Sequence, residues 1–232
     1  MPDDIATYPP DAGATTYLLT VRGATNAPTL EEARALHNAT AGAPQSAAGA
    51  RALGDLSHNV FAPISKELDG QLLFIDRWNS LSGLGMFFAN PQVQEAAGQL
   101  FSTRDGIVWS RLDGFGGFAL PVPAGRTTAA VGLIRVSVTS VDDAAKAFTA
   151  YAGTTINTAR SYGMVSHTTW LRLPNPGEPA TNEIIGVDTW MDAARMNEYY
   201  DLSLGFDHFG PVFAGAPETS VWRTAPGEWV EW

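Results

Sequence analysis

The sequence predicts an α+β fold made of two repeated units. Four short segments recur in the same order at a nearly constant separation of about 110 positions, and regularly spaced self-similarity of this kind indicates a tandem duplication. Signals for strands and helices also follow one another in the same order in both halves. The recurring segments are 57–58 with 166–167, 73–78 with 185–190, 98–101 with 210–213, and 108–111 with 221–223.

In the first half, Thr29-Leu30-Glu31-Glu32 forms a capping box, which predicts that a helix follows. The Gly-Ala-Pro sequence at 42–44 should break this helix before a second segment that ends near Leu53. Two shorter helices are expected, one capped at 79–80 and one starting at Asn90-Pro91. Period-2 alternation and turn residues predict strands at 17–22, 58–64, 71–78 and 107–111.

The second half repeats this order with one long helix. Ser140 should cap a helix whose apolar residues, from Val141 to Ala159, fall on one face. Two short helices are expected after residue 190. Strands are expected at 131–138, 164–173, 183–190 and 219–223.

Each half is therefore β-α-β-β-α-β, the ferredoxin-like arrangement. Such a sheet carries helices on one face only, and its other face must be covered. The sister unit is available for this, so we expect two sheets packed face to face as an α+β barrel with a cavity between them. The expected parts are a loose N-terminal segment at 1–14, a first unit at 15–112, a linker at 113–127, and a second unit with the C-terminal tail at 128–232.

The composition of the chain excludes several classes of function and partner. A net charge of −10 argues against nucleic acid and anionic membranes as partners. The absence of cysteine excludes disulfides, thiolate metal sites and a cysteine nucleophile. The first residues lack the basic and apolar segments of a secretory signal, and no apolar run approaches the roughly 20 residues that span a bilayer. We therefore expect a cytoplasmic protein.

Residues 70–111 and 182–223 share a longer pattern: an apolar strand, acid-x-Trp, a short helix, an aromatic pair, a second short helix and a strand with a tryptophan. This pattern resembles the antibiotic-biosynthesis-monooxygenase type of the dimeric α/β-barrel superfamily, here as a fused duplicate. The family includes quinone-forming oxygenases without cofactors, heme-degrading oxygenases, cyclases and proteins of no known chemistry. The resemblance implies a pseudo-dimeric monomer, with a further homodimer left open.

His58 and His167 are the leading candidates for catalysis, because histidine exchanges protons near neutral pH. Both begin the second strand of their unit. The sequence leaves open whether they face the helices or the expected cavity, and whether they are catalytic or structural. Asp76 and Asp188 could orient these histidines or bind an arginine such as Arg51, and we expect the Asp–Arg bond.

Aromatic residues form the second candidate group. Trp78 and Trp190 occupy the tryptophan position of the resembled family, as packing anchors or as ligand contacts. An aromatic pair, Phe87 and Phe88, becomes a tyrosine pair in the second unit. The candidate ligand-binding residues are Trp78, Trp190, Tyr199, Tyr200, Phe61, Trp170 and His208.

Heme is the alternative cofactor. In the heme-degrading branch a histidine on the second short helix ligates iron, and the resemblance places Ala96-Ala97 there in the first unit and His208, about one residue out of register, in the second. An asparagine that this branch uses on the first strand is missing from 17–22. The histidines at 37, 58, 167 and 208 lack metal-site spacing. We expect no metal and no cofactor.

Three functions remain. The first is an oxidoreductase without a metal that acts as a monooxygenase on a small apolar or aromatic molecule, with His58 or His167 as the base. The second is a non-catalytic binding or structural protein, and the third a heme protein. Because the second unit carries the more polar set, we expect it to line any pocket, and we expect His167→Ala to reduce turnover more than His58→Ala.

Overall fold

The computed structural model describes residues 16–175, 177–202 and 206–232. The fold is α+β, as the sequence predicts. Within the described chain, residues 16–108 together with 224–232 form the first unit, and residues 109–223 form the second. The expected loose segment at 1–14 lies outside the described residues.

The first unit contains an antiparallel sheet in the order β4-β1-β3-β2. Strand β3 lies in the middle and pairs with β1 along its whole length, from Tyr17 opposite Trp78 to Ala24 opposite Gln71. Every residue of β3 after Gln71 is buried, so this strand is the centre of the unit. The strands are β1 (Tyr17–Thr25), β2 (Asp55–Pro63), β3 (Gln71–Trp78) and β4 (Phe101–Leu112).

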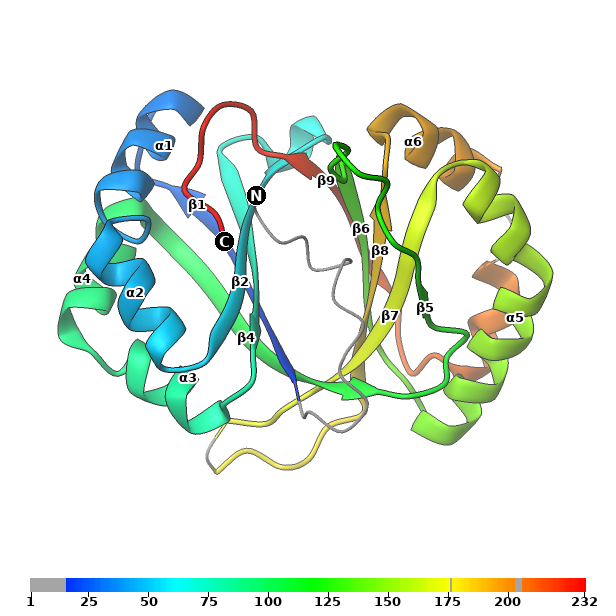
Figure 1. Ribbon diagram of the computed structural model, residues 1–232. Helices are drawn as coiled ribbons and strands as arrows, with labels where there is room; N and C mark the ends of the chain where they lie inside the picture. The colour runs from blue at the N-terminus through cyan, green and yellow to red at the C-terminus, as the bar shows by residue number, and fades with distance from the viewer. Residues whose placement is uncertain (1–15, 176, 203–205) are drawn as a thin grey trace. The chain divides into compact units, whose positions relative to one another are not determined.

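Helices cover one face of this sheet (Figure 1). Three of their starts follow the caps read from the sequence: the Thr29 side chain accepts from the Glu32 amide, and Ser80 and Asn90 cap the helices at 81–88 and 91–100 in a similar way. The break at 42–44 separates the first two helices, as expected. The helices are α1 (Leu30–Ala39), α2 (Pro44–Ala52), α3 (Leu81–Phe88) and α4 (Pro91–Leu100), with a 3-10 turn η1 at Lys66–Leu68.

The second unit repeats this plan with the order β9-β6-β8-β7-β5. Its long helix α5 (Val141–Ser161) starts at a Ser140 cap, as the sequence predicts, and packs its apolar residues into the core. The other elements are β5 (Phe118–Ala119), β6 (Ala130–Ser137), β7 (Met164–Arg172), β8 (Glu183–Trp190), α6 (Ala193–Asp201), a 3-10 helix η2 (Phe206–Val212) and β9 (Glu218–Thr224).

The ends of β4 and β9 lead the chain from one unit into the other. Residues Trp109–Leu112 of β4 belong to the second unit and pair with β7. The tail 224–232 belongs to the first unit, where Trp232 and His58 exchange two backbone hydrogen bonds. Figure 1 shows this tail passing along β2. The sequence-based division grouped the tail with the second unit, whereas here it completes the first.

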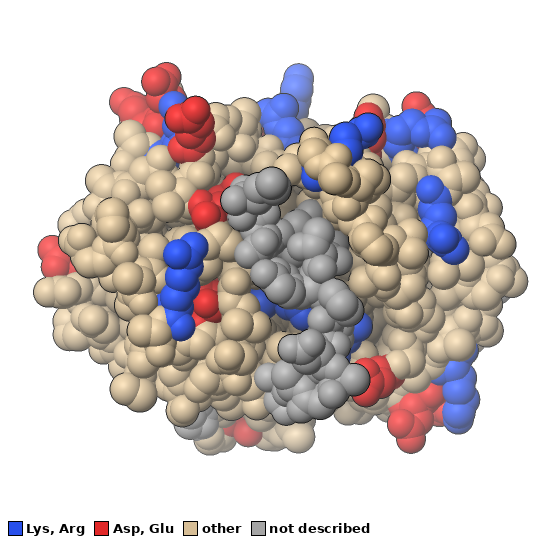
Figure 2. All heavy atoms as spheres, viewed as in Figure 1, with Lys and Arg blue, Asp and Glu red and all other residues tan. Residues whose placement is uncertain are grey.

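Two further features bear on partners. Among the described helices, none is both long enough and apolar enough to cross a membrane. On the face shown in Figure 2, Lys and Arg side chains are scattered and form no continuous patch.

Candidate active site

A β-bulge in each unit decides where the candidate histidine points. In the first unit Asp55 pairs with Trp78 and His58 with Asp76, with a register shift between Asp55 and Ser57. Alternation alone would put Asp55 and His58, three residues apart, on opposite faces of the sheet. The extra residue, Leu56, is exposed, and both polar side chains therefore face the helices. The sequence left open whether His58 faces the helices or the space expected between the two sheets, and in the structure it faces the helices.

His58 is hydrogen-bonded to Asp76. The distance from its Nδ1 to Asp76 Oδ1 is 2.7 Å, and both side chains are buried. Asp76 thus orients a histidine, and the expected Asp–Arg bond was wrong for this residue. Directly opposite positions on neighbouring antiparallel strands bring the two groups together.

His37, which the sequence analysis did not single out, extends this pair. Its Nε2 lies 3.0 Å from His58 Nε2, and its ring is fully buried and stacks parallel to that of His58. Its Nδ1 lies 3.0 Å from Asn38 Oδ1. The three side chains, on α1, β2 and β3, form a continuous hydrogen-bonded chain.

Contacts with the C-terminal tail determine which atom donates and which accepts in each of these hydrogen bonds. Asn38 Nδ2 donates to the Glu228 carbonyl, while its Oδ1 accepts from the Val230 amide. Because Asn38 Oδ1 can only accept, His37 Nδ1 must donate to it, and a neutral His37 then accepts at Nε2. His58 therefore donates from Nε2, its Nδ1 is the acceptor, and the proton of that bond belongs to Asp76.

Burial supports this neutral arrangement. It lowers the pKa of His37 to about 3, with a further contribution from His58. It lowers the pKa of His58 to about 4 against the opposing effect of Glu231. Burial also raises the pKa of Asp76 well above its usual value. At neutral pH the three groups carry no net charge.

The tail also closes the site with aromatic rings. Trp232 stacks on His58 with ring centres 4.8 Å apart, and Trp229 packs on His37 at 5.2 Å. The Arg51 guanidinium lies 5.3 Å above the Trp232 ring. Glu231 Oε1 accepts from the Val60 amide of β2. The tail is thus a wall of the site and not a loose end.

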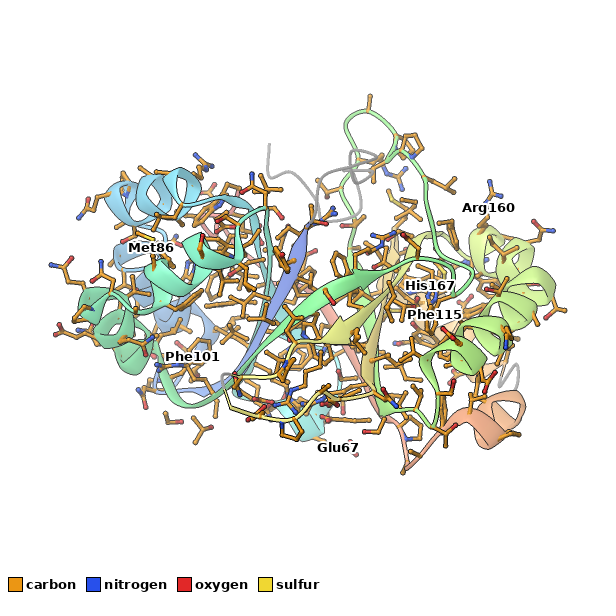
Figure 3. The ribbon with its side chains drawn as sticks, turned by 90° about the horizontal axis from the view of Figure 1, so that it is seen from below. Glu67, Met86, Phe101, Phe115, Arg160 and His167 are labelled. Atoms are coloured by element: carbon orange, nitrogen blue, oxygen red, sulfur yellow. The ribbon has the colours of Figure 1, made fainter. Side chains whose placement is uncertain are left out.

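A cavity of about 640 Å³ lies in the first unit between the sheet and the helices. Its walls are mainly apolar, and Met86, which is 64% exposed, and Phe101 both contribute to them (Figure 3). The polar side chains that line it from the sheet are Asp55, His58 and Asp76, which are buried, and Arg104 of β4, which is exposed. All of its described lining residues belong to the first unit.

The second unit has a corresponding histidine–aspartate pair, in which the aspartate also bonds a tyrosine. His167 Nδ1 lies 2.5 Å from Asp188 Oδ1, and the Tyr200 hydroxyl donates to Asp188 Oδ2 at 2.9 Å. The expected Asp–Arg bond was therefore wrong here also. Burial would lower the pKa of His167, but Asp188 and a hydrogen bond to the Phe115 backbone outweigh it and raise that pKa. The pKa of His167 is thus shifted in the opposite direction to that of His58.

Phe115 closes the second unit over this pair. It is 1% exposed and adopts a positive φ of 56°, which is uncommon for a residue with a side chain. Phe148 stacks on His167, and Phe209 packs on Phe148. Figure 3 shows Phe115 beside His167. The ring of His167 thus lies against Phe148, with a second aromatic ring packed behind it.

Tyr200, which has Phe88 as its counterpart in the first unit, occupies space left by a glycine on the neighbouring strand. Gly132 pairs with Asp188 across β6 and β8, and a Cβ on Gly132 would lie 2.0 Å from the Tyr200 hydroxyl. At the corresponding pairing in the first unit, Leu19 lies opposite Asp76. The Tyr200 hydroxyl therefore has a specific hydrogen-bond partner, Asp188, and Gly132 leaves the space that the hydroxyl occupies.

The remaining candidates have structural surroundings. Trp78 and Trp190 are fully buried and pack on the aromatic pairs at 87–88 and 199–200. Phe61 and Trp170 are three residues beyond the two histidines and lie on the other face of their sheets. Trp170 donates to Thr168 Oγ1 at 3.0 Å. His208 lies in η2, and its side chain is outside the described residues.

No family model matches the chain, and no curated protein matches it. Solved structures do. A protein described as anthrone oxidase-like aligns with a TM-score of 0.63 at 14% identity, over 91% of this chain and 92% of that one. A candidate monooxygenase from Fusobacterium nucleatum gives 0.59 at 12%, over 92% and 94%. A variant of chlorite dismutase from Candidatus Nitrospira defluvii gives 0.54 at 11%, over 92% of both chains.

The chain has the ferredoxin-like α/β-barrel fold of these proteins. At such identities the likeness establishes the fold alone. The choice of function depends on the site.

Proposed function

We propose that the cavity of the first unit binds a small aromatic or apolar molecule and oxidises it with dioxygen, with the His58–Asp76 pair as the base. The observation that carries this proposal is a buried histidine–carboxyl pair that opens onto a largely apolar cavity. The names of two structural neighbours, an anthrone oxidase-like protein and a candidate monooxygenase, support the same reaction class.

Asp76 can become a basic carboxylate without losing its proton to solvent. Transfer of the shared proton from Asp76 to His58 Nδ1 leaves a carboxylate at the cavity wall and an imidazolium behind it. His37 can accept the proton that His58 holds on Nε2. A carboxyl group with a raised pKa is also a stronger base than an ordinary one when it ionises.

The substrate supplies the electrons in this proposal. The base removes a proton from an activated methylene, and the carbanion formed reduces dioxygen. The net change converts the methylene and O2 into a carbonyl and water. One oxygen atom enters the substrate, and the other leaves as water with the two hydrogens of the methylene. An apolar cavity protects the carbanion from protonation by solvent.

Matched substitutions in the two units test this proposal. Asp76→Asn and Asp188→Asn make the same chemical change in both copies. With anthrone as the substrate, followed by oxygen uptake and quinone absorbance, Asp76→Asn should lower kcat at least about a hundredfold, the usual effect of losing a general base. Asp188→Asn should stay within about threefold of the wild type. Equal losses would refute the assignment to the first unit.

The proposal reverses our sequence-based ranking of the histidines. His167 has its ring nitrogens committed to Asp188 and to the Phe115 backbone, and the ring of Phe148 stacks on it. His58 lines one. We therefore expect the larger loss of activity on substitution of His58.

Non-catalytic binding is the second candidate, because every ring nitrogen of His37 and His58 already has a partner. Ligand binding without oxygen uptake would favour it. We do not extend the proposal to heme: the only histidine among the described cavity residues is His58, with both nitrogens occupied, and Ala96 and Ala97 line the cavity where the resemblance placed an iron ligand.

A further inference from the structure

Asp55 is a second carboxyl group in the cavity, and the proposed base does not use it. It is the first residue of β2, is 5% exposed and lines the cavity together with His58 and Asp76. Its Oδ1 is buried and has no hydrogen-bond partner within the described part of the chain. A buried polar atom without a partner is costly, so this oxygen requires an explanation.

The second unit shows that the fold does not need an acid here. It has the same bulge, between Met164 and Ser166, and Met164 pairs with Trp190 as Asp55 pairs with Trp78. A methionine therefore satisfies this position in one copy. The acid occurs in the copy that contains the cavity and the neutral histidine chain.

Asp55 is protonated at neutral pH. Burial raises its pKa to about 9, the Asp76 carboxyl adds to this, and the Ser57 amide, the Trp232 indole and Arg51 only partly oppose it. A protonated carboxyl group is a hydrogen-bond donor. The cavity thus presents a donor next to an apolar wall and beside the base.

We propose that Asp55 donates a hydrogen bond to the bound molecule, so that the cavity selects neutral aromatic ketones and rejects aromatic carboxylates. This selection refines the proposed function and rests on it. A carbonyl oxygen accepts this bond and gains negative charge when a proton leaves the adjacent carbon, so the bond strengthens during the reaction. A carboxylate is charged at pH 7 and would have to leave water for a largely apolar cavity, where the lining cation Arg104 is exposed and already donates to Gln94.

Three naphthalenes of similar size test this inference by binding alone. Titrations of tryptophan fluorescence, with Trp232 in the cavity wall as a reporter, would compare 2-acetylnaphthalene, 2-ethylnaphthalene and 2-naphthoate at pH 7. We expect the wild type to bind the ketone about tenfold more tightly than either of the others, the scale of one buried hydrogen bond.

Two substitutions of Asp55 distinguish the effect of the hydrogen-bond donor from the effect of the cavity shape. Asp55→Met copies the residue of the second unit and should reduce ketone binding to the level of 2-ethylnaphthalene. Asp55→Asn keeps an N–H donor and should preserve the preference. Raising the pH from 7 to 10 should weaken ketone binding to the wild type but not to Asp55→Asn.

An unchanged ketone preference in Asp55→Met would overturn the inference, as would equal binding of ketone and naphthoate or binding of none of the three. Anthrone turnover without ketone preference would leave the proposed oxidation standing. Ketone preference without turnover would reject the oxidation and keep the assignment of Asp55.

Discussion

Two histidines that each follow a serine have pKa values shifted in opposite directions. Ser57-His58 and Ser166-His167 occupy the same bulge in their units. Burial lowers the pKa of His58 to about 4, whereas Asp188 and the Phe115 backbone raise the pKa of His167. The identity of the residue thus does not fix its chemistry, because the second partner of each ring comes from a distant segment.

Replacing Asp55 with asparagine should stabilise the protein at neutral and alkaline pH. The unfolded chain loses the Asp55 proton near pH 3.8, while the folded chain keeps it to about 9. Between these values the unfolded state binds fewer protons, so the contribution of Asp55 to stability is present below pH 3.8 and is lost as pH rises toward 9. Urea unfolding at pH 8 should show Asp55→Asn more stable on the order of 2 kcal/mol.

The gain should shrink toward pH 4, where both states hold the proton. A gain of the same size at pH 4 and pH 8 would show that the substitution acts through packing and that Asp55 is not protonated by burial.

Gly132 and Tyr200 should behave as a coupled pair. A Cβ at Gly132 displaces the Tyr200 hydroxyl from Asp188, and a typical hydrogen bond contributes about 0.5–1.5 kcal/mol net. Gly132→Ala and Tyr200→Phe should each destabilise the protein by about this amount. The double variant should lose clearly less than the sum, because both changes remove the same bond. Additive losses in denaturant unfolding would show that the two residues are independent.

The sequence predicted the candidate pairs but not their partners. Recurrence placed His58 and Asp76 on adjacent strands, and the acid was expected to bind arginine because a buried carboxyl needs a partner. The arginines took other partners: Arg135 bonds Glu183 and Arg22 bonds Gln71. His37 and Asp55 were missed. His37 lies on a buried helix face next to Ala33, but only the bulge brings Asp55 to the same face as His58.

At the level of elements, the C-terminal tail controls the histidine chain. Deleting 227–232 removes the Val230 and Glu228 contacts of Asn38 and the rings over His37 and His58. Water would then reach both imidazoles, and their pKa values, now about 3 and 4, should rise toward 6.5. Titration of the histidine carbon resonances by NMR measures this rise.

His167 is the internal control for the deletion, because the tail belongs to the first unit. Its titration should not change. If the pKa values of His37 and His58 stayed low without the tail, the burial would come from the helices alone.

Most elements could be predicted because their signals are local. The caps at Thr29, Ser140 and Asn90 and the break at 42–44 depend on residues within one turn. Strand β4 was predicted from residue 107 but starts at Phe101, since the Asp105-Gly106 pair continues the strand where a turn was expected. The place of the tail could not be predicted, because its partners lie about 170 to 190 positions away.

For the whole molecule, two units with the same arrangement of elements hold two different sites. Both units have the bulge, the histidine, the acid and the tryptophan. The first combines them with Asp55, a histidine chain and the described cavity, and the second with Tyr200 and Gly132. The face-to-face packing of the two sheets remains a prediction. The ferredoxin-like fold was predictable from periodicity and recurrence, whereas this divergence depends on single residues whose effect appears only after folding.

The divergence can be measured directly in the four histidines of the chain. Proton-detected NMR of the imidazole nitrogens, with assignments from single substitutions, reports the charge of each ring between pH 4 and 9. Our account predicts that His37 and His58 remain neutral from pH 9 to below 5, while the pKa of His167 lies above its usual value of 6.5. A His58 that titrates near 6.5 together with a His167 whose pKa lies below that value would contradict it.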